Sequence, residues 1–135
     1  MMQQKIEYEK LVPGYEFTST SFKLDSTVIK SYLTATEDDS RIYEEGKIVP
    51  PMAIAALAMA AMSTRLELPA GTIHVSQELA FYDTANVGET LTSYARVNQK
   101  VERSKFRMLT MGIKVENKKK ATVMIGESSF TLPLK

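Results

Sequence analysis

The chain has 135 residues, 44% of them hydrophobic, which fits one domain with an ordinary core, so a single domain over residues 1–135 is expected. With 17 basic and 16 acidic residues, the net charge of +1 gives no electrostatic reason to expect nucleic acid or an anionic membrane surface as a partner. The absence of cysteine excludes disulfides and thiolate chemistry, and the single histidine, His74, argues against a metal site.

The first third of the chain predicts one strand and one helix. Its first seven residues include acids and no apolar stretch, so no signal peptide is expected and the protein is predicted to be cytoplasmic. Residues 15–24 alternate loosely and predict a first strand. Asp25 or Ser26 then caps a helix whose three- and four-residue spacing predicts a buried face made of Val28, Ile29, Tyr32 and Leu33. This helix is expected to end at the acidic, turn-like residues 37–40.

An alanine-rich segment, residues 48–62, is apolar on every side and predicts a buried helix. The segment is shorter than the roughly 20 residues needed to span a bilayer. Pro50 and Pro51 also suit the first turn of a helix better than a membrane interior. A core helix is therefore predicted, and a membrane partner is not.

Four later segments predict strands, because they are rich in β-branched and aromatic residues and are separated by short polar turns. They span residues 73–81, 90–101, 106–115 and 121–132. In the third, apolar residues at every second position predict one face packed against something apolar. A long alanine-rich helix wrapped by an antiparallel sheet of about five strands is the hot-dog architecture, an α+β fold in which small side chains let the sheet approach the helix closely.

Three short motifs resemble the MaoC-like (R)-specific enoyl-CoA hydratases and dehydratases. Residues 32–43 read Tyr-Leu-Thr-Ala-Thr-Glu-Asp-Asp-Ser-Arg-Ile-Tyr, similar to the family's active-site pattern Phe/Tyr-Ala-x-Ala-Thr-Gly-Asp-x-Asn-Pro-Ile/Leu-His. Residues 87–91 resemble the family's Val-Gly-Asp-Thr-Leu, and residues 74–79 resemble the His-x-x-Gln-Glu-Phe stretch of a dehydratase subgroup with paired subunits. The three motifs occur in the family's order, which supports the fold, while the activity is a separate question.

The resemblance implies the reversible addition of water to the double bond of a trans-2-enoyl thioester. In the family an Asp and a His share the water, and a backbone N–H at the start of the central helix contacts the thioester oxygen. Asp38 keeps the Asp position, whereas Tyr43 stands where the family has His, and a phenol of pKa about 10 is a poor base at neutral pH. Pro50 and Pro51 replace the family's His-Gly, so Met52 or a neighbour would have to supply the N–H donor. Asp38 is thus the candidate catalytic carboxylate, with Tyr43, Pro51 and Met52 as candidate substrate contacts.

Three further features have both a functional and an ordinary structural interpretation. His74 is the second candidate catalytic residue, as a replacement for the missing imidazole, although a lone histidine at the start of a strand is more often structural. The lysines at 118–120 could meet the phosphates of coenzyme A, but a charged hairpin turn is usually just solvated. Several methionines could line an acyl tunnel, and core filling is the simpler interpretation.

The resemblance predicts a protein that binds acyl-CoA or acyl carrier protein thioesters, without a cofactor or metal. Hot-dog proteins of this kind typically join their sheets in dimers, so a homodimer or a heterodimer with a second hot-dog subunit is expected. Two cases stay open: a working hydratase with a rearranged acid–base pair, or a non-catalytic subunit of a paired dehydratase. The replacement of His by Tyr43 favours the second case slightly. An acyl-CoA thioesterase is the alternative function, and a lipid-sensing regulator is disfavoured because no length is left for a DNA-binding module.

Overall fold

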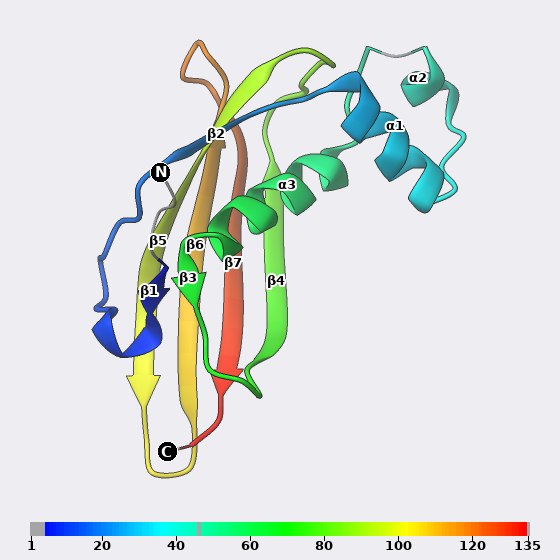
Figure 1. Ribbon diagram of the computed structural model, residues 1–135. Coiled ribbons are helices and arrows are strands. Elements are labelled where there is room, and N and C mark those ends of the chain that lie inside the picture. The colour runs from blue at the N-terminus through cyan, green and yellow to red at the C-terminus, as the bar shows by residue number, and fades with distance from the viewer. Residues whose placement is uncertain (1–4, 46, 135) are drawn as a thin grey trace.

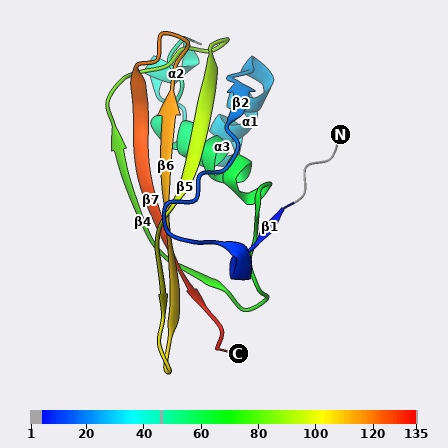
Figure 2. The ribbon, with the colours of Figure 1, turned by 90° about the vertical axis from the view of Figure 1, so that its left-hand side faces the viewer.

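Five strands form one antiparallel sheet, in the order β2-β5-β6-β7-β4. The structure, a computed structural model, describes residues 5–45 and 47–134. The strands are β2 (Thr20–Lys23), β4 (Ile73–Phe81), β5 (Thr90–Glu102), β6 (Arg107–Glu116) and β7 (Thr122–Leu132). Helix α3 (Pro51–Ser63) lies across one face of this sheet (Figure 1 and Figure 2). The predicted α+β hot-dog architecture is confirmed.

Shorter elements lie at the two ends of the helix. Near its C-terminal end, β1 (Ile6–Glu7) pairs in parallel with β3 (Leu66–Glu67), and a 3₁₀ turn, η1 (Tyr8–Lys10), follows β1. Beyond its N-terminal end, α1 (Ser26–Ala35) and α2 (Arg41–Glu44) project past the β4 edge of the sheet (Figure 1). We call residues 26–44, which hold α1, α2 and the turn between them, the overhang.

The core lies between α3 and the inner face of the sheet. The alternation predicted for β6 is confirmed, because its inner side chains are almost completely buried: Leu109, Met111, Ile113 and Val115. From the helix, the buried side chains are mostly small: Ala53, Ile54, Ala55, Ala58 and Met62. Small side chains allow the close approach of helix and sheet that dense packing requires.

The first predicted strand, residues 15–24, is wrong in its first half, because regular pairing begins only at Thr20. Before Thr20 the chain runs beside β5 with separate hydrogen bonds, such as those from the Gly14 N–H to the Val97 oxygen and from the Phe17 N–H to the Ala95 oxygen. Gly14 has a φ of 89°, a left-handed conformation that interrupts an extended strand.

Helices α1 and α3 both expose apolar residues that the sequence had predicted to be buried. In α3, Met52 is 53% exposed, and Ala56 and Ala60 are exposed too, because the sheet covers only one side of the helix. In α1, Ile29 is buried and Val28 is 42% exposed, because the overhang extends beyond the sheet that could cover it. Across the described residues, no helix combines the length and apolar character needed to cross a membrane.

Candidate active site

The turn that ends α1 fixes the backbone of the candidate carboxylate. The Asp38 N–H donates to the Leu33 oxygen at 3.0 Å and the Glu37 N–H donates to the Thr34 oxygen at 3.2 Å, which is the paired pattern of a Schellman cap. Glu37 holds the left-handed position of this cap, with a φ of 54°, and glycine is the usual residue there. Glu37 also occupies the position at which the MaoC-like pattern has Gly. A side chain at such a position costs about 1 kcal/mol.

Asp38 is ionised and partly exposed. Its carboxylate accepts a hydrogen bond from the Ser40 N–H at 3.0 Å. This backbone bond, with a smaller contribution from the Ser40 side chain, holds the pKa of Asp38 below its ordinary value. A lower pKa makes a carboxylate a weaker base, so Asp38 suits holding a water molecule by accepting its hydrogen bond better than removing the proton unaided.

Tyr43 is tied to Asp38 through one residue, Ser40. The Ser40 N–H binds the Asp38 carboxylate, and the Ser40 oxygen accepts the Tyr43 N–H at 3.0 Å, at the start of α2. No hydrogen bond joins the two side chains directly within the described part of the chain. Ser40 was not predicted from the sequence as a site residue, although an Asp two residues before a Ser is a common turn signal.

The start of α3 presents one free amide. Pro51 has no N–H, and the Pro50 oxygen accepts the N–H groups of Ala53 at 2.9 Å and of Ile54 at 3.4 Å. In the described structure this leaves the Met52 N–H as the amide of the first turn without a protein acceptor. A helix N-terminus favours negative charge, so this amide fits the donor expected for a thioester oxygen.

His74 lies apart from these residues. It is the second residue of β4, and its ring stacks on Phe130 with centroids 4.8 Å apart and planes at 27°. The overhang lies at the other end of β4, where the strand finishes at Phe81, roughly 23 Å further along at about 3.3 Å per residue. The structure therefore joins Asp38 to the Tyr43 backbone through Ser40 and gives His74 a packing contact elsewhere.

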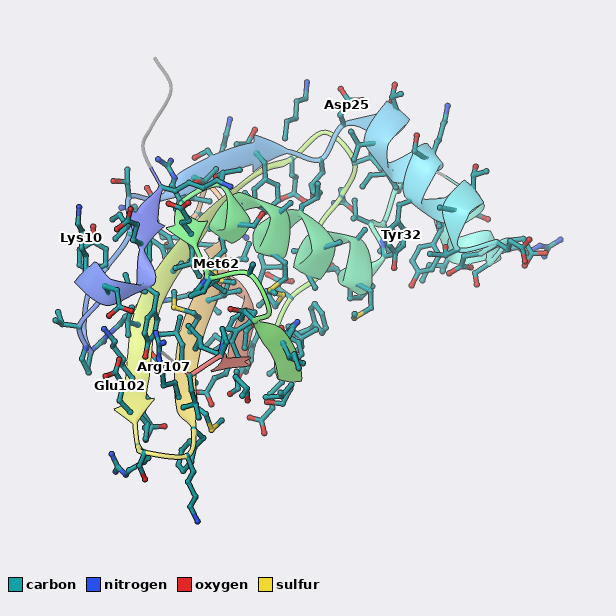
Figure 3. All side chains as sticks on the ribbon, turned by 60° about the horizontal axis from the view of Figure 1, so that its bottom comes forward. Lys10, Asp25, Tyr32, Met62, Glu102 and Arg107 are labelled. Carbon is teal, nitrogen blue, oxygen red and sulfur yellow. The ribbon has the colours of Figure 1, made fainter. Side chains whose placement is uncertain are left out.

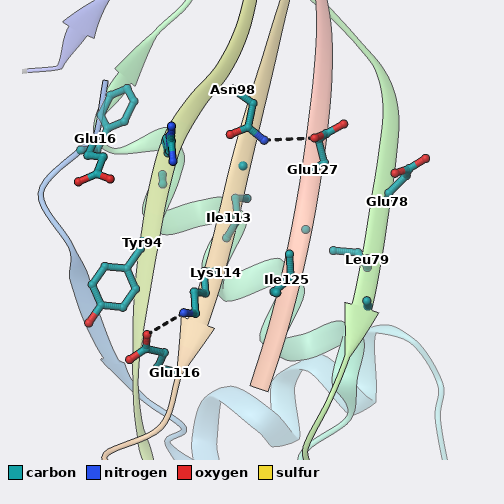
Figure 4. A pocket seen from close by; sticks show the side chains of 16 residues that line it. Glu16, Glu78, Leu79, Tyr94, Asn98, Ile113, Lys114, Glu116, Ile125 and Glu127 are labelled. Atoms are coloured by element: carbon teal, nitrogen blue, oxygen red, sulfur yellow. Dashed lines mark hydrogen bonds and ion pairs between the residues drawn. The ribbon is translucent and has the colours of Figure 1, made fainter. Parts of the chain in front are cut away.

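No metal cluster accompanies Asp38 in the described part of the chain. Within the described residues, no group of three or more His, Asp or Glu side chains could hold a metal ion. A hollow of about 870 Å³ lies on the outer face of the sheet, the face turned away from α3 (Figure 4). In the chain taken alone, Met52 is 53% exposed and Asp38 is partly exposed.

The sequence profile of the family described as FAS1-like, dehydratase domain region, matches residues 11–125. The chain belongs to this family. No curated protein matches the chain. The match covers the segment of Asp38 and Tyr43 as well as the central helix, and it confirms the predicted relationship to hydratases and dehydratases.

Solved structures share the fold of this FAS1-like dehydratase region. The R-hydratase PhaJ1 from Pseudomonas aeruginosa, in its unliganded form, is 22% identical, with a TM-score of 0.78 over 97% of this chain and 88% of that one. The (R)-hydratase from A. caviae involved in PHA biosynthesis is 20% identical, with a TM-score of 0.74 over 93% and 99%. The HadBC (3R-hydroxyacyl-ACP dehydratase) complex from Mycobacterium tuberculosis is 14% identical, with a TM-score of 0.70 over 90% and 98%. These likenesses and the family match identify a MaoC-like hot-dog protein of the hydratase and dehydratase type.

Proposed function

We propose that the chain binds acyl thioesters as the non-catalytic subunit of a paired dehydratase, whose other subunit carries the complete Asp and His pair. The observation that carries this proposal is the turn around Ser40, which joins the Asp38 carboxylate to the backbone of Tyr43, the residue that stands where the family has His. The free Met52 amide supports the binding of a thioester oxygen at the start of α3. Of the proposed substrate contacts, Pro51 forms the first turn of α3, and Met52 supplies the backbone N–H that donates to the thioester oxygen.

The missing imidazole is the reason to assign the chemistry to a partner. Hydration needs a group that removes a proton from water as its oxygen bonds to the β-carbon, and a group that delivers a proton to the α-carbon. General acid–base catalysis is commonly worth about 10² to 10⁴ in rate. Asp38, with its lowered pKa, and Tyr43, a phenol, do not together replace a neutral imidazole.

The β4 edge is the proposed contact with the partner. β4 is the last strand of the sheet, and its outward side has no neighbour within the described residues of the chain. Its exposed apolar residues include Ile73, 61% exposed, and Val75, 49% exposed. Pairing with an edge strand of the partner would continue the sheet, cover the exposed side of α3 and place the overhang over the partner. The structurally similar HadBC dehydratase is a complex, which supports a two-chain assembly.

Turnover of an enoyl thioester by the chain alone tests the proposal. The purified chain is mixed with crotonyl-CoA and with a longer enoyl-CoA, and the enoyl absorbance is followed beside acyl-CoA binding by calorimetry. We expect binding without turnover, and we expect Tyr43→His to gain activity of about 10²-fold or more over the background. An Asp38→Asn change in the Tyr43→His background should remove that gain.

Two results would contradict the proposal. Turnover by the unmodified chain that is lost in Asp38→Asn would establish a hydratase with a rearranged acid–base pair, and its loss in His74→Ala would assign the missing group to His74. Release of free thiol from saturated acyl-CoA would instead establish the thioesterase alternative. The compartment that we expect for this protein is the cytoplasm.

A further inference from the structure

The hollow on the outer face of the sheet is shaped by a glycine and a β-bulge. Its floor includes Gly112 in the central strand β6. The β5 partner of Gly112 is Arg96, and the register of β5 shifts just beyond it, between Val97 and Gln99, where the Asn98 side chain lies over the glycine. A Cβ on Gly112 would lie 2.7 Å from Asn98 Nδ2, and this nitrogen donates to Glu127 at 3.1 Å. The glycine therefore leaves room for the Asn98 side chain to lie over the centre of the outer face and to reach Glu127.

The walls of the hollow are acidic and partly apolar (Figure 4). Carboxylates outnumber cations by four to two, although the whole chain carries a net charge of +1: Glu16, Glu78, Glu116 and Glu127 against Arg96 and Lys114. One of these acids is neutralised locally, because Lys114 Nζ lies 3.3 Å from Glu116 Oε1. Tyr94 and Ile125 add exposed apolar surface, at 40% and 44% exposed. A cationic segment with an apolar flank is the complementary partner for such a surface.

The turn between β6 and β7 supplies a cationic segment of this kind. Lys118, Lys119 and Lys120 are all exposed and form no ion pair within the described residues. The turn is held in shape because Asn117 Oδ1 accepts the N–H groups of Lys119 and Ala121, both at 3.0 Å. Three cations are therefore presented together by a fixed turn, at one end of the sheet that carries the acidic hollow.

We propose that two copies of the chain associate through their outer sheet faces, each seating its 118–120 turn in the acidic hollow of the other. Along the strand, the turn lies four residues from Lys114, or about 13 Å. A two-fold axis crossing the strands midway along this distance places both turns over both hollows, which makes the contact self-complementary and closed. The outer faces of the two copies overlap over only a short length of strand, so this contact is expected to be a small interface that depends on charge. It leaves the β4 edge free and does not depend on the proposed acyl-thioester function.

Sedimentation equilibrium of the full chain at low and high salt tests this contact. We expect self-association at low salt that weakens as salt rises, because exposed charges are screened within about 10 Å at 0.1 M. The charge of the turn is reversed in the variant Lys118→Glu, Lys119→Glu, Lys120→Glu. This variant should associate at least about tenfold more weakly than the wild type. A control with the same charge change at other exposed lysines should associate like the wild type: Lys5→Glu, Lys10→Glu, Lys105→Glu.

A charge exchange separates specific docking from a general effect of net charge. Adding Glu16→Lys and Glu127→Lys to the reversed turn should restore association, because both sides of the contact then change sign. Loss of association in the control, or failure of the exchange to restore it, would overturn the proposal. The proposal would also be overturned if the average molar mass measured by sedimentation changed neither with salt nor in the variant with the charge-reversed turn. The outer face would then be open to a different partner.

Discussion

The two ends of the molecule differ in how many long-range side-chain contacts they make within the chain. At one end, Tyr8 is buried beneath two cations: Lys100 Nζ lies 4.3 Å from the ring centroid and Arg107 Cζ lies 4.7 Å from it. Arg107 also donates to the Pro133 oxygen at 2.9 Å and pairs with Glu9 at 3.1 Å, while the Tyr8 hydroxyl donates to Glu102. We call this group the N-terminal clamp, because it joins the first described residues to the β5–β6 hairpin and to the end of the chain.

The overhang, at the other end, has few such contacts. Ile29 is the buried residue of α1, and Val28 and Ile42 expose apolar surface. Figure 3 shows the separation, with Glu102 and Arg107 at one end of the molecule and Asp25 and Tyr32 at the other. The clamp end is therefore held by contacts within the chain, whereas the end that carries Asp38 leaves apolar surface uncovered. Selective stability of this kind is common where a protein binds ligands or partners.

Removing Arg107 should have the largest effect on stability. We expect Arg107→Ala to lower the free energy of unfolding by about 3 kcal/mol, because it leaves a space where a buried side chain was, removes one of the two cations over Tyr8 and takes the donor away from the Pro133 oxygen. Chemical denaturation measures this change. Arg103→Ala is the control, since the Arg103 guanidinium bonds its neighbour's carbonyl at the surface, and its effect should be within about 0.5 kcal/mol. Equal losses in both variants would refute the special role of the clamp.

Glycine at position 37 should stabilise the overhang. We expect Glu37→Gly to gain about 1 kcal/mol, because glycine adopts a φ of 54° without the steric penalty of a side chain. Hydrogen exchange of the α1 amides reports the gain even if this helix opens separately from the core. Glu37→Ala keeps a Cβ and should bring no such gain, so equal protection in the two variants would argue against strain at Glu37.

Removal of the α1 cap tests whether the overhang unfolds with the core. The Asp25 carboxylate accepts the Thr27 N–H at 2.8 Å, so Asp25→Ala should cost about 1 kcal/mol. If the overhang opens separately, this cost will appear as faster exchange of α1 amides while the denaturation midpoint stays the same. Asp39→Ala, a change at an exposed neighbouring acid, is the control. A shift of the whole denaturation curve would show that the two ends are one cooperative unit.

The smallest expected effect is a dependence of clamp stability on alkaline pH. Burial raises the pKa of Tyr8 above its ordinary value, and Glu102 adds to the rise, against an opposing effect of Arg107. The neutral phenol is therefore favoured in the folded state. Its contribution is complete below about pH 10 and is lost as the pH rises through the folded pKa. Denaturation midpoints should fall less steeply in Tyr8→Phe than in the wild type over this range, and parallel slopes would contradict the assignment.

The sequence predicted the elements that have a strong local pattern. Ile73–Phe81 was predicted with its observed bounds, and of the two caps expected for α1, Asp25 and Ser26, the structure has Asp25, because alternation and capping are properties of neighbouring residues. The pairing of β1 with β3 could not be read in this way, since its partners are 60 positions apart. Helix α2 is only four residues long, which is too short for a hydrophobic period to develop.

The candidate site was predictable only in part. The motif located Asp38, Tyr43 and Met52, and their roles stay predictions. The link through Ser40 has a local signal, because an Asp side chain commonly binds the backbone N–H two residues on, whereas Glu at the left-handed position 37 gives no signal for that conformation. The exposure of Val28 was missed because the hydrophobic period marks a face that is to be covered, and it does not say whether the same chain covers it.

The open edge of β4 has a consequence for the protein before it meets a partner. A nine-residue strand with an unsatisfied row of N–H and C=O groups and exposed Ile73 and Val75 is a template for adding further strands, and within the strand only Glu78 and His74 are there to discourage it. Under the proposed pairing, a chain produced in excess of its partner would therefore add strands from other copies at this edge. Balanced production of two subunits would then limit this self-addition.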